Sequence, residues 1–177
     1  MHSILRPTTA FFTGRTAFLA RLHSTLRDTH LAAISGPSGM GKTTLARAYT
    51  RQFGKEYQRI LWMNVATREL ALLAGLGLAR TFHLLPTIEQ SLDTILPTLR
   101  SWLETQQDYL LILDNANDPA ALEALLPSQP TGYVLLTTSA PSTLSPALHL
   151  ELGPLEPEEG TLLLLRRAGL IDRKSVV

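Results

Sequence analysis

The sequence predicts an α/β fold in which a parallel sheet of five strands is flanked by helices on both faces. Two observations support this prediction. Five short apolar runs recur along the chain, and each is continuous rather than alternating, as strands buried on both faces require. Segments with helical periodicity separate the runs, so strand and helix alternate and the sheet is doubly wound in three layers. The expected strands are residues 31–35, 60–65, 109–114, 133–139 and 148–152.

Helices are predicted between these strands and in front of the first one. Apolar residues with the spacing i, i+3, i+4 and i+7 mark 18–26, and a second apolar stripe runs over 45–53 until Gly54. Further helices are expected at about 68–82, 90–106 and 118–126. After Gly153 another helix is expected, because Pro157 and two glutamates stand at its start and two arginines near its end, as the helix dipole favours.

The chain is expected to divide at about Gly153. Residues 1–153 make up the predicted sheet domain, and 154–177 are interpreted as the truncated start of a following helical domain. The reason is that the leucine-rich helix after Gly153 has no later element to cover it. We therefore expect a fragment of a longer protein, with a naturally short chain as the alternative.

Composition excludes several kinds of function. Sixteen Lys and Arg against 15 Asp and Glu give a formal charge of +1, so no bulk positive field favours direct binding of nucleic acid. The absence of cysteine excludes disulfides, zinc–thiolate sites and thiol nucleophiles. The longest uncharged apolar run, 70–79, is far shorter than the ~20 residues that span a bilayer. With no secretory signal at the N-terminus, we expect a cytoplasmic chain that does not bind membranes.

A glycine-rich segment directly follows the first predicted strand. Residues 36–44 read GPSGMGKTT, which matches the phosphate-loop pattern G-x-x-x-x-G-K-[ST], with an amphipathic helix after it. The backbone N–H groups of such a loop cradle phosphate oxygens, and the helix adds its positive N-terminal end. Lys42 is expected to bind the β- and γ-phosphates, and Thr43 to bind Mg²⁺. The predicted phosphate-binding residues are Pro37, Ser38, Gly39, Met40, Gly41, Lys42, Thr43 and Thr44.

This context predicts a P-loop NTPase fold. Two competing motifs fail at the same place. The third glycine of a dinucleotide fingerprint is missing, and Met40 stands where a nucleophile elbow requires glycine.

An acidic residue ends the third predicted strand. Asp114 is expected at the carboxyl edge of the sheet, where its carboxylate would bind Mg²⁺ directly or through water. Asp118 is instead expected to cap the next helix. Many P-loop ATPases have a glutamate after the strand aspartate, but this chain has Asn115, whose amide positions a water without accepting its proton. Lys42, Asp114 and Asn115 are the predicted catalytic residues, and hydrolysis is expected to be slow.

Several segments, taken in order, resemble a known family. FFTGR, GPSGMGKTTLA, ILWMNVAT, YLLILDNANDPAALEALLP, GYVLLTTS and LELGPLEPEEG resemble the nucleotide-binding core of the NB-ARC group of STAND signal-transduction ATPases, of the bacterial kind. The likeness covers about residues 8–170. It implies a molecular switch that holds ADP at rest, exchanges it for ATP to oligomerise, and resets by hydrolysis.

The resemblance also implies roles for particular residues. Gly14 and Arg15 would lie by the adenine, with Phe12 and Thr13 as backbone neighbours. In the family an arginine after two threonines senses the γ-phosphate, whereas here Ser139 follows Thr137 and Thr138. Thr138 and Ser139 are predicted to hydrogen-bond the phosphate or a water, with an ordinary strand end as the alternative. A neutral hydroxyl does not compensate phosphate charge as guanidinium does.

The sequence therefore predicts an ATP/ADP-binding regulatory switch with slow Mg²⁺-dependent hydrolysis. Its expected partners are nucleotide, other domains of a longer protein and further copies of itself. Three alternatives stay open: an AAA+-type motor ATPase, a nucleotide-dependent phosphotransferase, and a protein in which nucleotide only stabilises the fold. The preference for adenine rests on the resemblance and on the absence of an NKxD segment.

Overall fold

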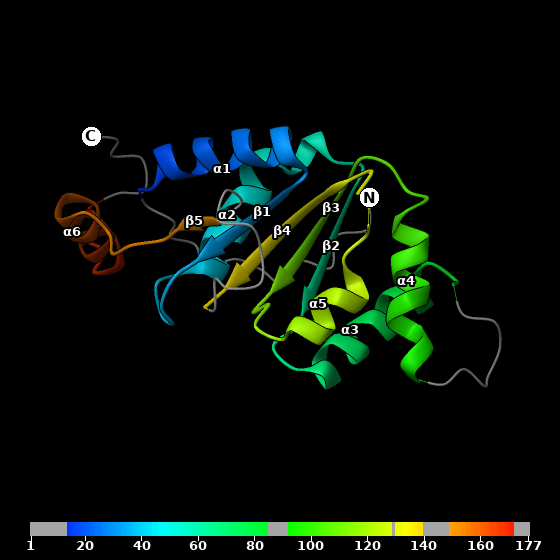
Figure 1. Cartoon of the computed structure of the whole chain (residues 1–177). Helices are drawn as coiled ribbons and strands as arrows, with labels where there is room; N and C mark the ends of the chain where they lie inside the picture. Colours follow the sequence, from blue (N-terminus) through cyan, green and yellow to red (C-terminus); the bar gives the residue numbers. More distant parts are fainter. Residues whose placement is uncertain (1–13, 85–91, 129, 140–148, 172–177) are drawn as a thin grey trace.

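The computed structural model describes residues 14–84, 92–128, 130–139 and 149–171, and its centre is a five-stranded parallel sheet. The strands lie in the order β2-β3-β4-β1-β5, with β5 at the edge beside β1 (Figure 1). The fold predicted from the apolar runs is confirmed, and each strand begins and ends within one or two residues of its predicted bounds. The strands are β1 Leu31–Ser35, β2 Arg59–Asn64, β3 Tyr109–Asp114, β4 Tyr133–Thr138 and β5 His149–Glu151.

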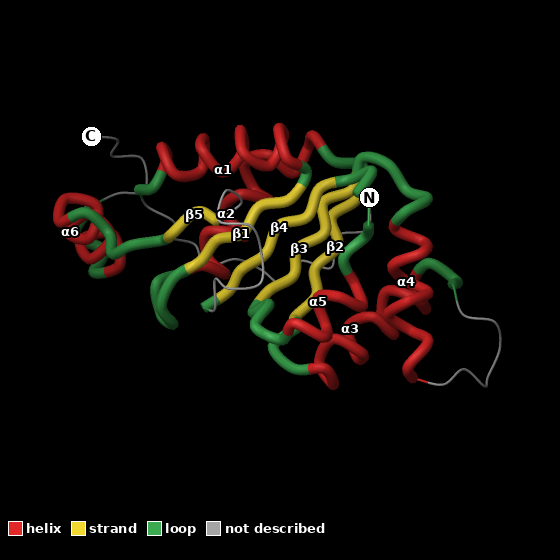
Figure 2. The backbone as a smooth tube through the Cα atoms, in the orientation of Figure 1, coloured by secondary structure: helices red, strands yellow, loops and turns green. Residues whose placement is uncertain are grey.

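Helices cover both faces of this sheet (Figure 2). Two of them, α1 and α2, pack on one face, and α3, α4 and α5 pack on the other. The helices are α1 Thr16–Thr29, α2 Lys42–Phe53, α3 Arg68–Thr81, α4 Ile95–Leu103, α5 Pro119–Leu125 and α6 Pro157–Arg167, with short 3₁₀ turns at Gly54–Glu56 and Leu92–Thr94. Among the helices of the described ranges, none combines the length and the apolar character needed to cross a membrane.

The core consists of two apolar clusters, one on each face of the sheet. Successive side chains of a strand point to opposite faces, so Leu111 and Leu113 of β3 join the cluster under α3, α4 and α5. Leu110 and Ile112 join the cluster under α1 and α2. All six residues of β3 are buried. The continuous apolar run of the sequence is thus explained by a central strand that meets no water on either side.

One helix is shorter than predicted. The helix expected at about 90–106 is observed as α4 over Ile95–Leu103, preceded by a 3₁₀ turn, and residues 85–91 lie outside the described part of the chain. Pro97 explains the late start, because a proline fits only the first turn of an α-helix. Pro97 is the third residue of α4, where its missing N–H is not needed.

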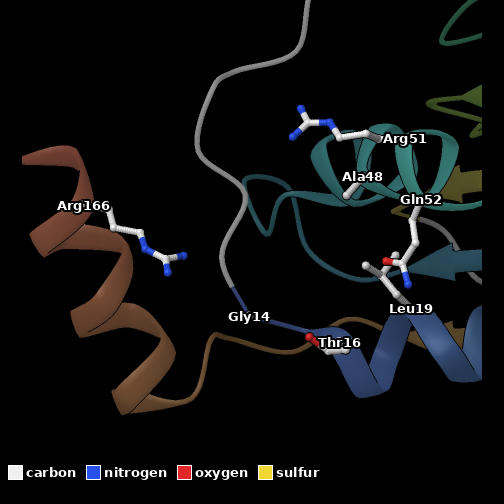
Figure 3. Close-up of a pocket in the computed structure, with 7 residues that line it drawn as sticks. All are labelled: Gly14, Thr16, Leu19, Ala48, Arg51, Gln52 and Arg166. Carbon is white, nitrogen blue, oxygen red and sulfur yellow. The ribbon is translucent and has the colours of Figure 1, made fainter. Parts of the chain in front are cut away.

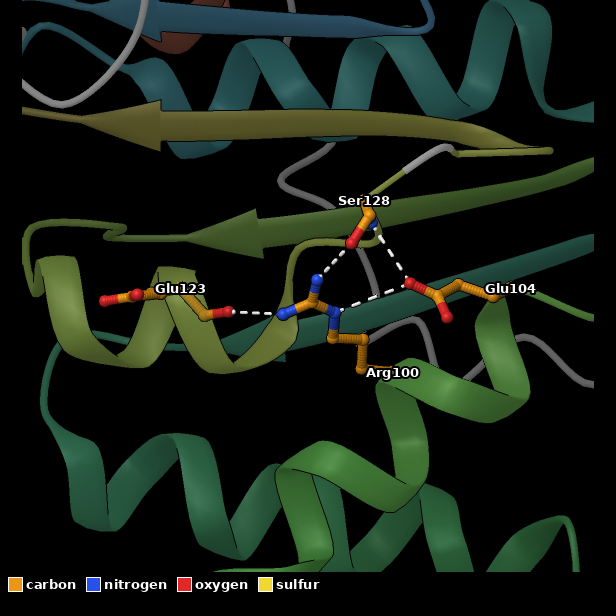
Figure 4. Close-up of polar contacts among 4 residues, drawn as sticks. All are labelled: Arg100, Glu104, Glu123 and Ser128. Carbon is orange, nitrogen blue, oxygen red and sulfur yellow. Dashed lines mark hydrogen bonds and ion pairs between the residues drawn. The ribbon is translucent and has the colours of Figure 1, made fainter.

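A polar network joins α4 to α5 at the surface (Figure 4). The Arg100 guanidinium donates to the carbonyl oxygen of Glu123 at 3.0 Å and to the Ser128 hydroxyl, and it contacts Glu104 Oε1 at 3.5 Å. The Ser128 N–H donates to the same Glu104 oxygen at 3.1 Å. These contacts hold the C-terminal end of α5 and the start of the following connection against α4.

The last helix, α6, lies beyond the β5 edge of the sheet and has no fully buried residue (Figure 1). It begins at Pro157 with Glu158 and Glu159 in its first turn, and Arg166 and Arg167 are in its last turn, as the sequence predicts. Leu164 of α6 is 70% exposed and Leu170 is 71% exposed. One contact that attaches this helix is made in its first turn, where Glu159 accepts the Arg15 N–H.

Candidate nucleotide and magnesium site

The phosphate loop connects β1 to α2 at the carboxyl edge of the sheet, and three of its glycines have positive φ. Gly36 has φ +143°, and a Cβ there would lie 2.7 Å from the carbonyl oxygen of Leu152, so only glycine fits. Gly39 has φ +83° and Gly41 φ +87°, and a Cβ at either position would meet nothing within 4 Å. At these two positions it is the positive φ of the backbone that favours glycine. The space beside the loop is open to a ligand.

Lys42 is the first residue of α2, and its side chain turns back over the loop. Its Nζ donates to the carbonyl oxygens of Gly36 at 2.7 Å and Pro37 at 2.8 Å. The ammonium therefore lies against the same segment whose N–H groups would receive phosphate. This concentrates positive charge where the helix N-terminus is also positive.

Asp114 and Thr43 are brought together as the sequence predicts. The Thr43 hydroxyl donates to Asp114 Oδ1 at 2.8 Å, although the two residues lie 71 positions apart. The Asp114 side chain is at the end of β3 and is only 5% exposed. A hydroxyl and a carboxylate are the hard oxygen donors that Mg²⁺ prefers, so this pair fits the metal.

A second hydroxyl reaches the same carboxylate oxygen from β4. Thr137 Oγ1 donates to Asp114 Oδ1 at 2.6 Å and accepts the N–H of Asn115 at 2.9 Å. Asn115 has φ +59°, a left-handed conformation that asparagine tolerates better than most residues. We name Thr43, Asp114, Asn115 and Thr137 the strand-end network.

The end of β4 is held by Asn117 rather than by a charged group. Asn117 Oδ1 accepts hydrogen bonds from the Thr138 hydroxyl at 2.9 Å, the Ser139 N–H at 2.9 Å and the Ser139 hydroxyl at 3.1 Å. These contacts place Ser139, which is exposed, beside the turn that follows β3. The predicted sensor position is therefore built into the same edge as the strand-end network, but its hydroxyls already contact Asn117.

Asp118 takes the structural role that was predicted for it. Its Oδ1 accepts the N–H of Ala120 at 3.0 Å and of Ala121 at 3.4 Å, which caps the start of α5. The two aspartates of this segment thus have different contacts, since Asp114 accepts the Thr43 hydroxyl and Asp118 caps α5.

The residues expected near the base contact α6. The Arg15 N–H donates to Glu159 Oε1 at 2.6 Å, and the Arg15 guanidinium donates to the carbonyl oxygen of Gly153 at 3.0 Å. Gly14 has φ +75°, and a Cβ there would lie 2.5 Å from Cδ of Glu159. Burial lowers the pKa of the Arg15 guanidinium, and the Glu159 carboxylate acts in the opposite direction. We name Gly14, Arg15, Gly153 and Glu159 the Arg15 contact.

Two of the predicted base neighbours are not described. Phe12 and Thr13 lie outside the described residues, so their predicted contact with the adenine stays a prediction. The Arg15 contact itself places a carboxylate at the N-terminal end of α1, which the helix dipole favours.

A pocket of about 420 Å³ lies next to the Arg15 contact (Figure 3). Arg51 of α2 and Arg166 of α6 approach it from different sides (Figure 3). The described residues that line it are Gly14, Thr16, Leu19, Ala48, Arg51, Gln52 and Arg166. Residues of α2, the helix that begins at Lys42, and of α6, the helix that follows the sheet, therefore line the same pocket.

One known protein family matches more than half of the chain. The family described as "AAA domain" matches residues 26–128, a stretch that begins in α1, contains the phosphate loop and ends just after α5. The chain belongs to the AAA domain family. Membership in this family implies binding of nucleotide and of Mg²⁺. No curated protein matches the sequence.

Solved structures show the same fold at low sequence identity. Cdc6p from Pyrobaculum aerophilum is 16% identical, with a TM-score of 0.64, and the match covers 92% of this chain and 52% of that one. A Walker-type ATPase of Pyrococcus abyssi is 17% identical, with a TM-score of 0.57, and the match covers 95% of this chain and 62% of that one. This chain thus spans about half to three fifths of the length of these two proteins.

These comparisons refine the expectation drawn from the sequence. They support the predicted P-loop ATPase class, but they do not recover the NB-ARC group specifically. The AAA+-type alternative is supported better than the leading interpretation.

Sequence reasoning missed several residues of this site. It considered Thr138 and Ser139 but gave no role to Thr137, whose hydroxyl donates to Asp114. It also gave no role to Asn117, whose Oδ1 accepts hydrogen bonds from the hydroxyls of Thr138 and Ser139. A signal existed, because side chains of adjacent parallel strands meet at their carboxyl ends and alternate in direction. Glu159 and the pocket arginines carried no such signal, because they come from elements distant in the sequence.

Proposed function

We propose that this AAA domain is the nucleotide-binding module of an AAA+-type ATPase that binds ATP and ADP with Mg²⁺ and hydrolyses ATP slowly. The observation that carries the proposal is the Thr43–Asp114 hydrogen bond of 2.8 Å beside the phosphate loop. In it, a helix-borne hydroxyl and a strand-end carboxylate meet where the loop would present phosphate.

In this proposal, each residue of the site has a specific role in binding nucleotide or metal. The loop N–H groups and Lys42 bind the β- and γ-phosphates, and Lys42 exchanges its contacts with the Gly36 and Pro37 carbonyl oxygens for phosphate oxygens. Thr43 and Asp114 hold Mg²⁺, which neutralises phosphate charge when bound. Pro37 to Gly41 and Thr44 line the phosphates, while Thr138 and Ser139 face the γ-phosphate side.

Slow turnover follows from the residue after Asp114. A carboxylate at that position would accept a proton from the attacking water, and such assistance is typically worth about 10²–10⁴-fold in rate. Asn115 orients a water but accepts no proton, so we expect turnover below the ~1–10 s⁻¹ of ordinary enzymes.

The base is proposed to lie toward the Arg15 contact and the adjoining pocket. Gly14 and Arg15 supply backbone there, and Arg51 and Arg166 supply flat guanidinium groups beside it. Residues 154–171 are proposed to begin a further helical unit, since no residue of α6 is fully buried.

A second candidate is the regulatory switch that the NB-ARC resemblance implies. It is favoured by Asn115 and by the neutral Ser139, which suit slow hydrolysis, and by the Arg15 contact, which ties the proposed base region to α6. Light scattering with ADP and with ATP distinguishes the candidates: a switch changes its assembly state between the two nucleotides. An assembly state that is the same with ADP and with ATP would oppose the switch.

The direct test of the proposed ATPase is phosphate release by the chain and by Asp114→Asn. We expect slow Mg²⁺-dependent release that the substitution reduces by about 100-fold, because the neutral amide holds Mg²⁺ poorly. Asp118→Asn is the matched control, since asparagine caps a helix as well as aspartate does. Equal rates for wild type and Asp114→Asn would refute the assignment of the metal carboxylate.

A further inference from the structure

The Asp114 carboxylate is oriented by two hydroxyls, and only one of them belongs to the phosphate-loop motif. Thr43 of α2 and Thr137 of β4 both donate to Oδ1, at 2.8 Å and 2.6 Å. Two donors from different elements fix the direction of a carboxylate more firmly than one. Among the described residues, both of these hydroxyl contacts fall on Oδ1, which leaves Oδ2 for Mg²⁺ or for one of its waters.

The Thr137 hydroxyl has its donor and acceptor roles fixed by its neighbours. A threonine hydroxyl has one proton to donate and accepts through its lone pairs. The proton goes to Asp114, because an ionised carboxylate only accepts, and a lone pair takes the N–H of Asn115 at 2.9 Å. Thr137 thereby joins the metal-binding carboxylate to the left-handed turn that carries Asn115.

Because Thr137 is buried, its hydroxyl requires hydrogen-bond partners within the protein. Thr137 is 0% exposed on a strand with β1 on one side and β3 on the other. A hydroxyl in such a place costs free energy unless it is hydrogen-bonded, whereas valine has the same shape without that cost. The contacts with Asp114 and Asn115 are what compensate the hydroxyl.

We propose that Thr137 is a positioning residue for Mg²⁺ binding: its hydroxyl sets the orientation of the Asp114 carboxylate and the turn at Asn115. The inference rests on the proposed nucleotide and Mg²⁺ site. Thr137 acts through Asp114 and Asn115 and touches neither phosphate nor metal itself. It differs in this from Thr138 and Ser139, whose hydroxyls contact Asn117.

The experiment measures the affinity for ADP by isothermal titration, once with Mg²⁺ and once with EDTA, for wild type, Thr137→Val and Thr137→Ser. The ratio of the two affinities is the gain due to Mg²⁺. We expect Thr137→Val to reduce this gain by about tenfold or more, the value of one hydrogen bond to a charged group, with the affinity in EDTA unchanged. Thr137→Ser keeps the hydroxyl and is expected to retain the gain.

Controls separate positioning from a general loss of structure. Thr50→Val removes another buried hydroxyl, which donates to the Arg47 carbonyl oxygen within α2, and it should change neither affinity. Thr137→Ala lacks the hydroxyl too and should repeat the Thr137→Val pattern, which covers the case in which valine disturbs folding.

Two results would overturn the proposal. One is a full Mg²⁺ gain in Thr137→Val and Thr137→Ala. The other is an equal loss of affinity with Mg²⁺ and with EDTA, which a purely structural role predicts. Failure of the proposed function looks different, because folded wild type would then bind ADP in neither condition.

Discussion

The strand-end network and the Arg15 contact lie at the two sides of the proposed nucleotide site, and they are built in different ways. In the network, Thr43 and Thr137 donate to one carboxylate that is 5% exposed, at the end of a fully buried strand. In the Arg15 contact, a loop and α6 meet through partly exposed groups, and α6 has no fully buried residue.

The difference shows where rigidity is placed in this AAA domain. Buried mutual hydrogen bonds leave few alternatives, since an unpartnered group there would cost about 1–3 kcal/mol. Partly exposed contacts lose little when they open, because water replaces them. We therefore expect the metal side of the site to be fixed and the side toward α6 to adjust when a nucleotide binds.

The largest expected difference concerns two glycines, Gly36 of the phosphate loop and Gly14 of the Arg15 contact. Gly36→Ala is expected to lower the free energy of unfolding by about 3 kcal/mol, because of its φ and because the Leu152 carbonyl oxygen, 2.7 Å away, belongs to backbone. That backbone is held by the Leu152 N–H, which donates to the Ser35 carbonyl oxygen at 2.7 Å. Urea denaturation measures the change.

Gly14→Ala is the matched substitution at the Arg15 contact. It is expected to cost only about 1 kcal/mol, because the atoms in its way belong to the flexible Glu159 side chain and only the φ strain remains. Equal costs at Gly36 and Gly14 would mean that the phosphate loop and the Arg15 contact are equally rigid.

A smaller effect is expected at Asn115, the residue proposed to position the attacking water. Asn115→Glu should raise the rate of ATP hydrolysis by about tenfold or more, because it supplies a proton acceptor after Asp114, with part of the gain lost to the positive φ. Asn115→Gln introduces a side chain as long as glutamate that does not accept a proton, and it serves as the control. If phosphate release by Asn115→Glu stays at the wild-type rate, a missing base is not what limits turnover.

The smallest effect is expected at α6. Glu159→Gln keeps an acceptor for the Arg15 N–H but loses the charge, so we expect a loss of about 0.5 kcal/mol in stability, typical of partly exposed charges. Glu158→Gln, its exposed neighbour in the first turn of α6, is the control for thermal or urea unfolding. A loss above about 2 kcal/mol would show that the Arg15 contact is as strongly coupled as a buried network.

The strand-end network and the Arg15 contact also differ in how far they can be predicted from the sequence. The strands follow from apolar runs, and the phosphate loop from a contiguous motif, since both signals are local. Asp114 followed from its place at a strand end. The strand-end position of Thr137 was also a local signal, but its contact with Asp114 depends on the register of β3 against β4, which pairs Leu113 with Leu136. Glu159 lies 144 positions from Arg15, so nothing local in the sequence reveals their hydrogen bond.

The central claim is that phosphate binds at the loop through Lys42, and one titration tests it most directly. Nucleotide-stripped protein is titrated with ADP in the presence of Mg²⁺, beside Lys42→Ala and Lys55→Ala, the latter an exposed lysine in the turn after α2. The account predicts micromolar or tighter binding for wild type and Lys55→Ala, and a loss of about 100-fold in Lys42→Ala. Equal binding by all three proteins, or no heat from folded wild type, would contradict it.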